Sequence, residues 1–212
     1  MDKLDELFEK QCNIKNDITL DMYYDIVETN EYLKKCKTNK NITDTSLYYL
    51  IKDEFPNFSQ SDKIKFGTGL EKVINNIILK YTDYNDIKPK NKKGKKEKDS
   101  LFIKGNIIIY AEYKSNINLD TEKSLKTINK CIQIEEELKV KYPHCNIIMN
   151  LVNFRYLTYD DIPKLLQKKY KKISNHLLGL NDFLKLYNLK TFNDYDEYKI
   201  FLNKIAEKML SD

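Results

Sequence analysis

The stretch of residues 99–114 limits the possible folds more than any other part of the chain, because it has the pattern of a tight β-hairpin. Two runs rich in β-branched and aromatic residues, 101–103 and 107–111, flank the pair Gly105 and Asn106. Glycine accepts positive φ at the first position of a two-residue turn, so this pair favours a hairpin between the two runs.

A turn at this pair brings two carboxylates and an ammonium together at the open end of the hairpin. Asp99 then faces Glu112, and directly opposed side chains lie about 5 Å apart at Cβ. Lys114 comes two residues later and leaves the same face of the strand. Carboxylates this close repel each other, and a divalent cation between them removes that penalty. Mg²⁺ suits such a pair, because it takes one or two protein carboxylates and keeps several waters.

Solvated charges on a surface hairpin are the ordinary interpretation of such a pattern in a lysine-rich chain. Two observations favour a site instead. Both faces of the hairpin are apolar further in, which is typical of a central strand pair. The charges also gather at one end only.

The segments after Lys114 predict a helix and a second long strand. Asp120 can cap a helix over residues 121–141, and Pro143 prevents its continuation. Residues 146–154 have the continuous apolar pattern of a strand buried on both faces. Strand, helix and strand in this order form a right-handed crossover with a parallel strand pair, so the hairpin joins a mixed sheet.

A helix is also predicted before the hairpin, where apolar residues recur at helical spacing from Phe66 to Tyr81. Thr68 and Glu71 have the spacing of a capping box. This predicts that Thr68 is the N-cap of the helix and that Glu71 lies in its first turn.

Asp99 and the triplet from Glu112 to Lys114 resemble the active-site motif of the PD-(D/E)XK nuclease superfamily, most closely that of small type II restriction endonucleases. One departure is Lys98, which stands where the motif has proline. The resemblance covers about residues 66–155. It implies an α/β (α+β) fold, in which a central mixed β-sheet forms an αβββαβ core between N- and C-terminal helices. It also implies metal-dependent hydrolysis of DNA.

The same resemblance assigns roles to the site residues. Asp99 and Glu112 would bind Mg²⁺, and Lys114 would be the catalytic lysine. Glu71 has a second role under this resemblance, since an acidic residue on the first core helix often joins the metal site in the family. Two roles therefore stay open for Glu71: a part in the helix cap and a part in the metal site.

The chain is expected to form one compact domain with three regions. We expect residues 1–65 to form a mostly helical region for target recognition or dimerisation, and residues 66–155 to form the catalytic core. Residues 156–212 predict a helical C-terminal region. Its helices are expected near 162–166, 177–187 and 198–210.

Two segments beside the hairpin are candidates for DNA contact. Residues 88–98 carry seven lysines and one acidic residue, which is ordinarily the pattern of a solvated loop. Because this run leads directly into Asp99, we favour the alternative that it attracts backbone phosphates without reading sequence. Its candidate contacts are Lys92, Lys93, Lys95 and Lys96. The polar residues just beyond the site fit either contact with phosphate and bases or an ordinary polar loop; they are Ser115, Asn116 and Asn118. Three lysines on the following helix are expected on a solvated face: Lys123, Lys126 and Lys130.

Composition limits the ligands, the cysteine chemistry and the cellular location to be expected of the protein. The net charge of +5 is compatible with DNA binding, but Arg155 is the sole arginine, so base recognition would depend on lysine, asparagine, glutamine and backbone. The four cysteines lack metal-binding spacing, which favours reduced thiols and disfavours zinc. No apolar run approaches the roughly 18 residues of a membrane span, and the acidic N-terminus is atypical of a signal peptide. The sequence therefore predicts a soluble cytoplasmic protein.

These observations predict a Mg²⁺-dependent endonuclease for double-stranded DNA, in the form of a sequence-specific type II restriction enzyme. A palindromic target would imply a homodimer, and a cognate DNA methyltransferase would protect the host. One alternative on the same core is a structure-selective repair or junction-resolving nuclease. An alternative from another class is a non-catalytic basic nucleic-acid-binding module.

Overall fold

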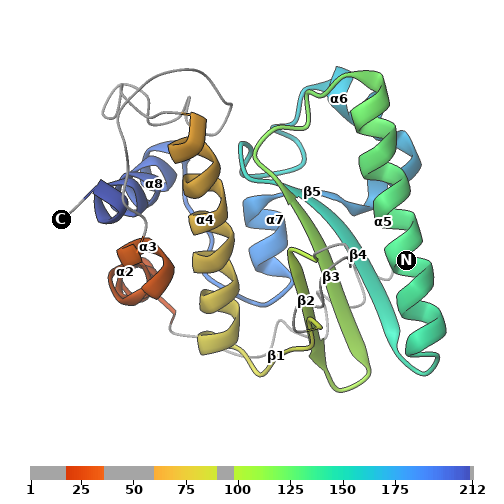
Figure 1. The fold of residues 1–212 in the computed structure, drawn as a ribbon, viewed down its shortest axis with the longest axis horizontal. Coiled ribbons are helices and arrows are strands. Elements are labelled where there is room, and N and C mark those ends of the chain that lie inside the picture. The colour runs from red at the N-terminus through yellow and green to blue at the C-terminus, as the bar shows by residue number, and fades with distance from the viewer. Residues whose placement is uncertain (1–17, 36–59, 90–97, 211–212) are drawn as a thin grey trace. The chain divides into compact units, whose positions relative to one another are not determined.

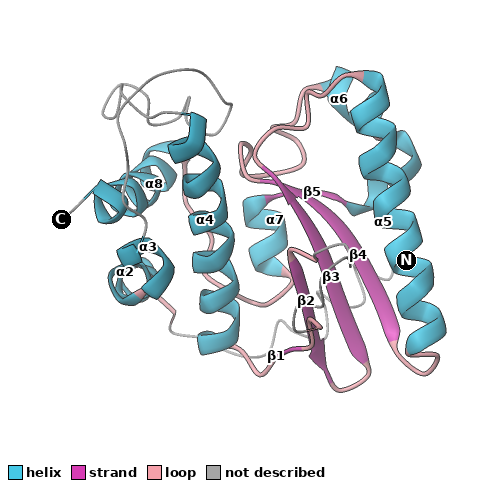
Figure 2. Cartoon of the chain, in the orientation of Figure 1, coloured by secondary structure: helices cyan, strands magenta, loops and turns pink. Residues whose placement is uncertain are grey.

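The chain divides into two compact units (Figures 1 and 2). A computed structural model describes residues 18–35, 60–89 and 98–210 of the 212 residues. Unit 1 combines the residues up to Thr82 with those from Asn181 onwards, and unit 2 is the continuous segment Asp83–Leu180.

Unit 2 contains a mixed sheet of five strands, counted over the described residues. Their order in the sheet follows the chain, and the first three strands are antiparallel while the last three are parallel. The strands are β1 (Asn85–Asp86), β2 (Ser100–Lys104), β3 (Ile107–Lys114), β4 (Asn146–Asn153) and β5 (Leu177–Gly179). The predicted mixed sheet is therefore confirmed.

The hairpin of β2 and β3 has the predicted register. Leu101 pairs with Tyr110 and Lys104 pairs with Ile107. Gly105 adopts φ +55°, a conformation that glycine reaches without steric cost, so the turn falls where the sequence places it.

The crossover after β3 also agrees with the prediction. Helix α5 (Thr121–Lys141) is capped by Asp120, whose carboxylate accepts the backbone N–H of Lys123 at 2.8 Å. It leads into β4, which pairs with β3 in parallel. With α4 (Gln60–Tyr81) ahead of β1, the elements follow the expected αβββαβ order along the chain.

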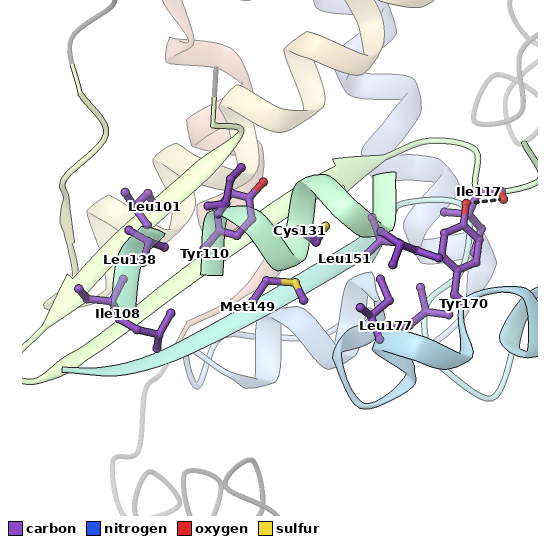
Figure 3. Close-up of a cluster of buried hydrophobic side chains, with 14 of the residues drawn as sticks. Leu101, Ile108, Tyr110, Ile117, Cys131, Leu138, Met149, Leu151, Tyr170 and Leu177 are labelled. Carbon is purple, nitrogen blue, oxygen red and sulfur yellow. Dashed lines mark hydrogen bonds between the residues drawn. The ribbon is translucent and has the colours of Figure 1, made fainter. Parts of the chain in front are cut away.

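A buried apolar cluster lies between the sheet and α5 (Figure 3). Tyr110 of β3, Met149 of β4 and Cys131 of α5 all belong to it. The short helix α6 (Lys164–Lys169) and the 3₁₀ segment η2 (Lys171–His176) add further residues to the same cluster. This core fixes which face of β3 looks toward α5.

Unit 1 is helical and joins the two ends of the described chain. Its elements are α2 (Leu20–Thr29), α3 (Glu31–Lys35), α4, α7 (Leu180–Lys185, whose first residue belongs to unit 2) and α8 (Tyr195–Leu210). Helix α8 contacts α2, α3 and α4. Tyr23 packs edge-on against Phe192 and Phe201, and its hydroxyl donates to the carbonyl of Lys190 at 2.7 Å.

Two predictions about helix boundaries are wrong. Helix α4 begins at Gln60, so Thr68 and Glu71 lie in its interior and do not form an N-terminal capping box. The strand β5 begins at Leu177, where the sequence predicts the start of a helix, and α7 begins only at Leu180. In each case the local pattern is compatible with the predicted boundary and with the observed one. Packing selects the boundary that forms.

None of the helices in the described residues combines the length and the apolar character that a membrane crossing requires.

Candidate active site

The hairpin register places the three predicted site residues on one face of the sheet. Tyr110 faces α5, and side chains two residues apart leave the same face, so Glu112 and Lys114 face α5 as well. Asp99 directly precedes β2 and lies two residues before Leu101, another member of the cluster on that face. Local strand periodicity thus brings these charges together.

The Glu112 carboxylate is only 2 % exposed and is held by three donors. Oε1 accepts from the Lys114 ammonium at 2.7 Å. Oε2 accepts from the Tyr110 hydroxyl at 2.9 Å and from the Lys130 ammonium at 2.5 Å. Burial by itself raises the pKa of Glu112, but Lys114 and then Lys130 outweigh it, so the pKa lies below its usual value.

Lys130 is a site residue that the sequence does not reveal. It projects from α5, where the pattern predicts a solvated face, and its side chain is only 24 % exposed because it reaches Glu112. Lys123 and Lys126 remain on the exposed face, where they pair with Asp120 and Glu122. Their expected position is therefore confirmed, and that of Lys130 is wrong.

Asp99 is partly buried beside this cluster. Its Oδ2 accepts the backbone N–H of Tyr113 at 2.8 Å, which fixes the carboxylate next to β3. Burial, followed by the negative charge of Glu112, raises the pKa of Asp99 to about 6, even though the Tyr113 N–H, Lys114 and Lys130 act in the opposite direction. Asp99 and Glu112 are thus close enough to repel each other, as the hairpin register predicts.

Tyr110 and Cys131 form the inner wall of the site and keep their protons. Burial and then the charge of Glu112 raise the pKa of the Tyr110 hydroxyl far above its usual value, so it remains a hydrogen-bond donor. The same two causes raise the pKa of the Cys131 thiol to about 12. A protonated, buried thiol is a poor nucleophile, and the charged groups of this site are carboxylates and ammonium groups.

The donor set of this site consists of carboxylate oxygens. Mg²⁺ prefers such hard oxygen ligands and uses one or two carboxylates together with waters and phosphate oxygens. Within the described residues, no group of three or more His, Cys, Asp or Glu side chains is arranged to hold a metal. Asp99 and Glu112 supply two carboxylates, and burial followed by the charge of Glu112 raises the pKa of Asp99.

The other predicted site residues fall in three places. Ser115, Asn116 and Asn118 lie in the loop directly after β3, and the Asn118 N–H donates to the Asn116 side chain at 2.8 Å. Glu71 lies within α4 of unit 1, and its role at the metal stays a prediction. Four lysines lie outside the described residues: Lys92, Lys93, Lys95 and Lys96.

Asn153 is a further polar residue of this region that sequence reasoning places only in a buried strand. It pairs with Lys114 in the parallel register of β3 and β4 and is fully buried. Its Oδ1 accepts the N–H of Arg155 at 2.7 Å, while its Nδ2 has no partner among the described residues. A polar residue at the end of an otherwise apolar strand is the signal that could have identified it.

Comparison with known proteins finds no matching family model, no similar curated protein and no similar solved structure.

Proposed function

We propose that this protein is a Mg²⁺-dependent endonuclease that hydrolyses phosphodiester bonds in double-stranded DNA. One observation carries the proposal: the hairpin register sets Asp99 beside Glu112 on one face of the sheet, and the Lys114 ammonium lies 2.7 Å from Glu112. Two carboxylates can hold Mg²⁺ beside a phosphodiester, and a neighbouring lysine can stabilise the charge that develops there. The αβββαβ order of elements supports membership of the PD-(D/E)XK nucleases.

Each residue has a defined task in this proposal. Mg²⁺, when bound, supplies positive charge to the scissile phosphate and lowers the pKa of a coordinated water. Asp99 and Glu112 would hold the metal, and the Tyr113 N–H keeps Asp99 in place. Lys114 would orient the attacking water or stabilise the developing phosphate charge. The Tyr110 hydroxyl continues to donate to the Glu112 carboxylate and orients it.

The form of the enzyme that we propose is a cytoplasmic type II restriction endonuclease. A homodimer would cut both strands of a palindromic target, and a cognate methyltransferase would protect the host genome. A repair or junction-resolving nuclease on the same core is the alternative. Discrete fragments from plasmid DNA support the first form, and nicks at branched DNA support the second.

One observation favours a second candidate, a non-catalytic nucleic-acid-binding module. Both oxygens of Glu112 already contact ammonium groups, from Lys114 and from Lys130. Such a cluster is electrically balanced without a metal and can serve structure alone. This candidate predicts DNA binding without hydrolysis under any divalent cation.

The decisive experiment is incubation of the purified protein with unmethylated plasmid and phage DNA in Mg²⁺, followed by mapping of the fragment ends. Cutting is expected in Mg²⁺ and absent in EDTA. Glu112→Gln keeps the shape of the side chain but removes its charge, and it should lower the cutting rate by at least about a hundredfold, roughly 3 kcal/mol in the activation barrier. Lys114→Ala should have a similar effect.

Glu122→Gln is the matched control, because Glu122 is exposed on α5 and pairs only with Lys126 there. It should cut like the wild type. Undiminished cutting by Glu112→Gln and Lys114→Ala would remove the proposed site, and absence of cutting with every divalent metal and DNA substrate would favour the binding module.

A further inference from the structure

The segment formed by α6 and η2 is strongly basic. Between Asp161 and Asp182 the chain contains no aspartate or glutamate. Five lysines fall within nine residues of this interval: Lys164, Lys168, Lys169, Lys171 and Lys172. The segment begins eleven residues after the last residue of β4, which runs parallel to β3.

Three of these lysines differ from those on α5. Lys123, Lys126 and Lys139 each pair with a carboxylate on or beside their own helix. The side chains of Lys168, Lys171 and Lys172 are exposed, and no carboxylate in the described part of the chain lies within ion-pair distance of them. Like charges gathered without counter-charges create a positive potential that attracts an anionic partner.

This segment is fastened to the loop that leaves the candidate active site. The Tyr170 hydroxyl donates to the carbonyl of Ile117 at 2.9 Å. A dashed line marks this hydrogen bond in Figure 3. The Lys169 ammonium donates to the carbonyl of Leu119. Tyr170 is completely buried, so the connection is part of the core and not a surface contact. The loop itself begins directly after Lys114.

The topology places both features at one end of the sheet. Parallel strands present their carboxyl ends at the same edge, so β3 ends in Lys114 where β4 ends in Asn153, next to the chain that continues to α6. In Figure 1, α6 lies beside the start of α5 at that end of unit 2. The hairpin turn and the end of α5 lie at the opposite end.

We propose that Lys164, Lys168, Lys171 and Lys172 form a surface, the α6–η2 basic surface, that binds the phosphate backbone of duplex DNA and leads it to the candidate active site. Lys169 and Tyr170 hold this surface at a fixed place relative to Lys114. The choice of DNA as the anionic partner rests on the proposed function. Binding is independent of base sequence, because lysine contacts to phosphate carry no sequence information.

The test is binding of a fluorescent random-sequence duplex, followed by anisotropy in EDTA at several salt concentrations. The variant K168Q/K171Q/K172Q removes three charges and leaves Lys169 and Tyr170 intact. At about 0.1 M salt its dissociation constant should rise at least about tenfold, and the slope of log K against log salt should shrink by about 3. Circular dichroism should show an unchanged fold.

The matched control is K104Q/K139Q/K141Q, which removes the same number of lysines at the opposite end of the sheet. It should bind the duplex within about twofold of the wild type. An equal loss in both variants would show that only net charge matters and would overturn the surface. Duplex binding by K168Q/K171Q/K172Q at the wild-type level would also overturn the surface. This holds even if that variant no longer binds single-stranded RNA or anionic vesicles.

Failure of this proposal and failure of the proposed function are distinguishable, because binding is measured without a divalent metal. Duplex binding through these lysines without cleavage in Mg²⁺ would keep the surface and refute the nuclease. Cleavage that the triple variant performs at the wild-type rate and the wild-type salt dependence would keep the nuclease and refute the surface.

Discussion

Glu112 is almost inaccessible to solvent and yet carries a charge, which the fold tolerates because two ammonium groups and a hydroxyl surround it. A buried carboxylate that loses a partner keeps its desolvation cost without compensation. At the scale of single residues, the charged groups of the site therefore depend on one another. Lys130 contributes as much as Lys114 to the stability of the metal-free protein, because both neutralise Glu112.

Lys130→Ala tests this coupling. The free energy of unfolding in EDTA should fall by about 1–2 kcal/mol, less than for a fully buried pair because Lys130 is partly exposed and Lys114 remains. Lys126→Ala is the control on the preceding turn of α5, and its exposed pair should cost less than about 0.5 kcal/mol. Urea unfolding measures both, and equal costs would show that Lys130 does not hold Glu112.

Asp99 predicts a pH dependence of stability in the metal-free protein. Its surroundings comprise Glu112 and Lys114 on β3 and Lys130 on α5, and burial with the Glu112 charge raises its pKa from 3.8 to about 6. The folded protein then binds this proton more tightly than the unfolded chain. The resulting stabilisation is complete below the usual pKa and is lost as the pH rises through about 6.

The isosteric variant Asp99→Asn removes this titration but keeps an acceptor for the Tyr113 N–H. Between about pH 4 and pH 7, the wild type should lose up to about 3 kcal/mol of unfolding free energy relative to the variant. Urea unfolding in EDTA at several pH values measures the difference. A difference that stays constant with pH would contradict the assigned pKa.

At the scale of secondary-structure elements, close backbone packing holds β5 in the sheet. A Cβ added to Gly179 would lie 2.4 Å from the carbonyl oxygen of Leu157, and a backbone atom cannot move aside as a flexible side chain can. β5 extends the sheet beyond β4 and directly follows η2, so its position also determines that of the α6–η2 basic surface.

Gly179→Ala should therefore lower the free energy of unfolding by about 2–4 kcal/mol. Gly67→Ala is the control, because nothing lies within 4 Å of its added Cβ and it sits inside α4. This second change should stabilise the protein by about 0.5–1 kcal/mol, since alanine is the better helix former. The thermal unfolding temperature is expected to fall in Gly179→Ala and to rise in Gly67→Ala.

The elements also show which features a sequence can predict. The hairpin register and the cap of α5 follow from residues close together in the chain, such as Gly105 and Asp120, and both are confirmed. β5 is only three residues long, and its apolar pattern also suits a helix. The contact of Lys130 with Glu112 depends on the rotation of α5 against the sheet, which no local pattern reports.

At the scale of the whole molecule, unit 1 depends on both ends of the described chain. Helix α8 buries Tyr198, Phe201 and Ile205 and contacts α2, α3 and α4. These short or amphipathic helices gain most of their stability from packing and little from their own propensity.

Deletion of residues 195–212 should therefore remove more helix than α8 alone contains, because α2 and α3 lose the surface against which they pack. Far-UV circular dichroism measures the helical content, and limited proteolysis should cut within residues 18–35. The control is deletion of residues 211–212 only, which leaves α8 in place. A loss confined to the share of α8 would show that the N-terminal helices fold without it.

The discontinuity of unit 1 has a consequence for biosynthesis. On the ribosome, the residues up to Thr82 emerge before the segment Asp83–Leu180, and their partners beyond Leu180 emerge after it. The whole of the intervening segment, with its hairpin and crossover helix, is translated during this interval, which at about 5–20 residues per second lasts several seconds or more. The nascent chain thus exposes the apolar sides of α2 and α4 throughout that time, when chaperones are the natural protection against aggregation.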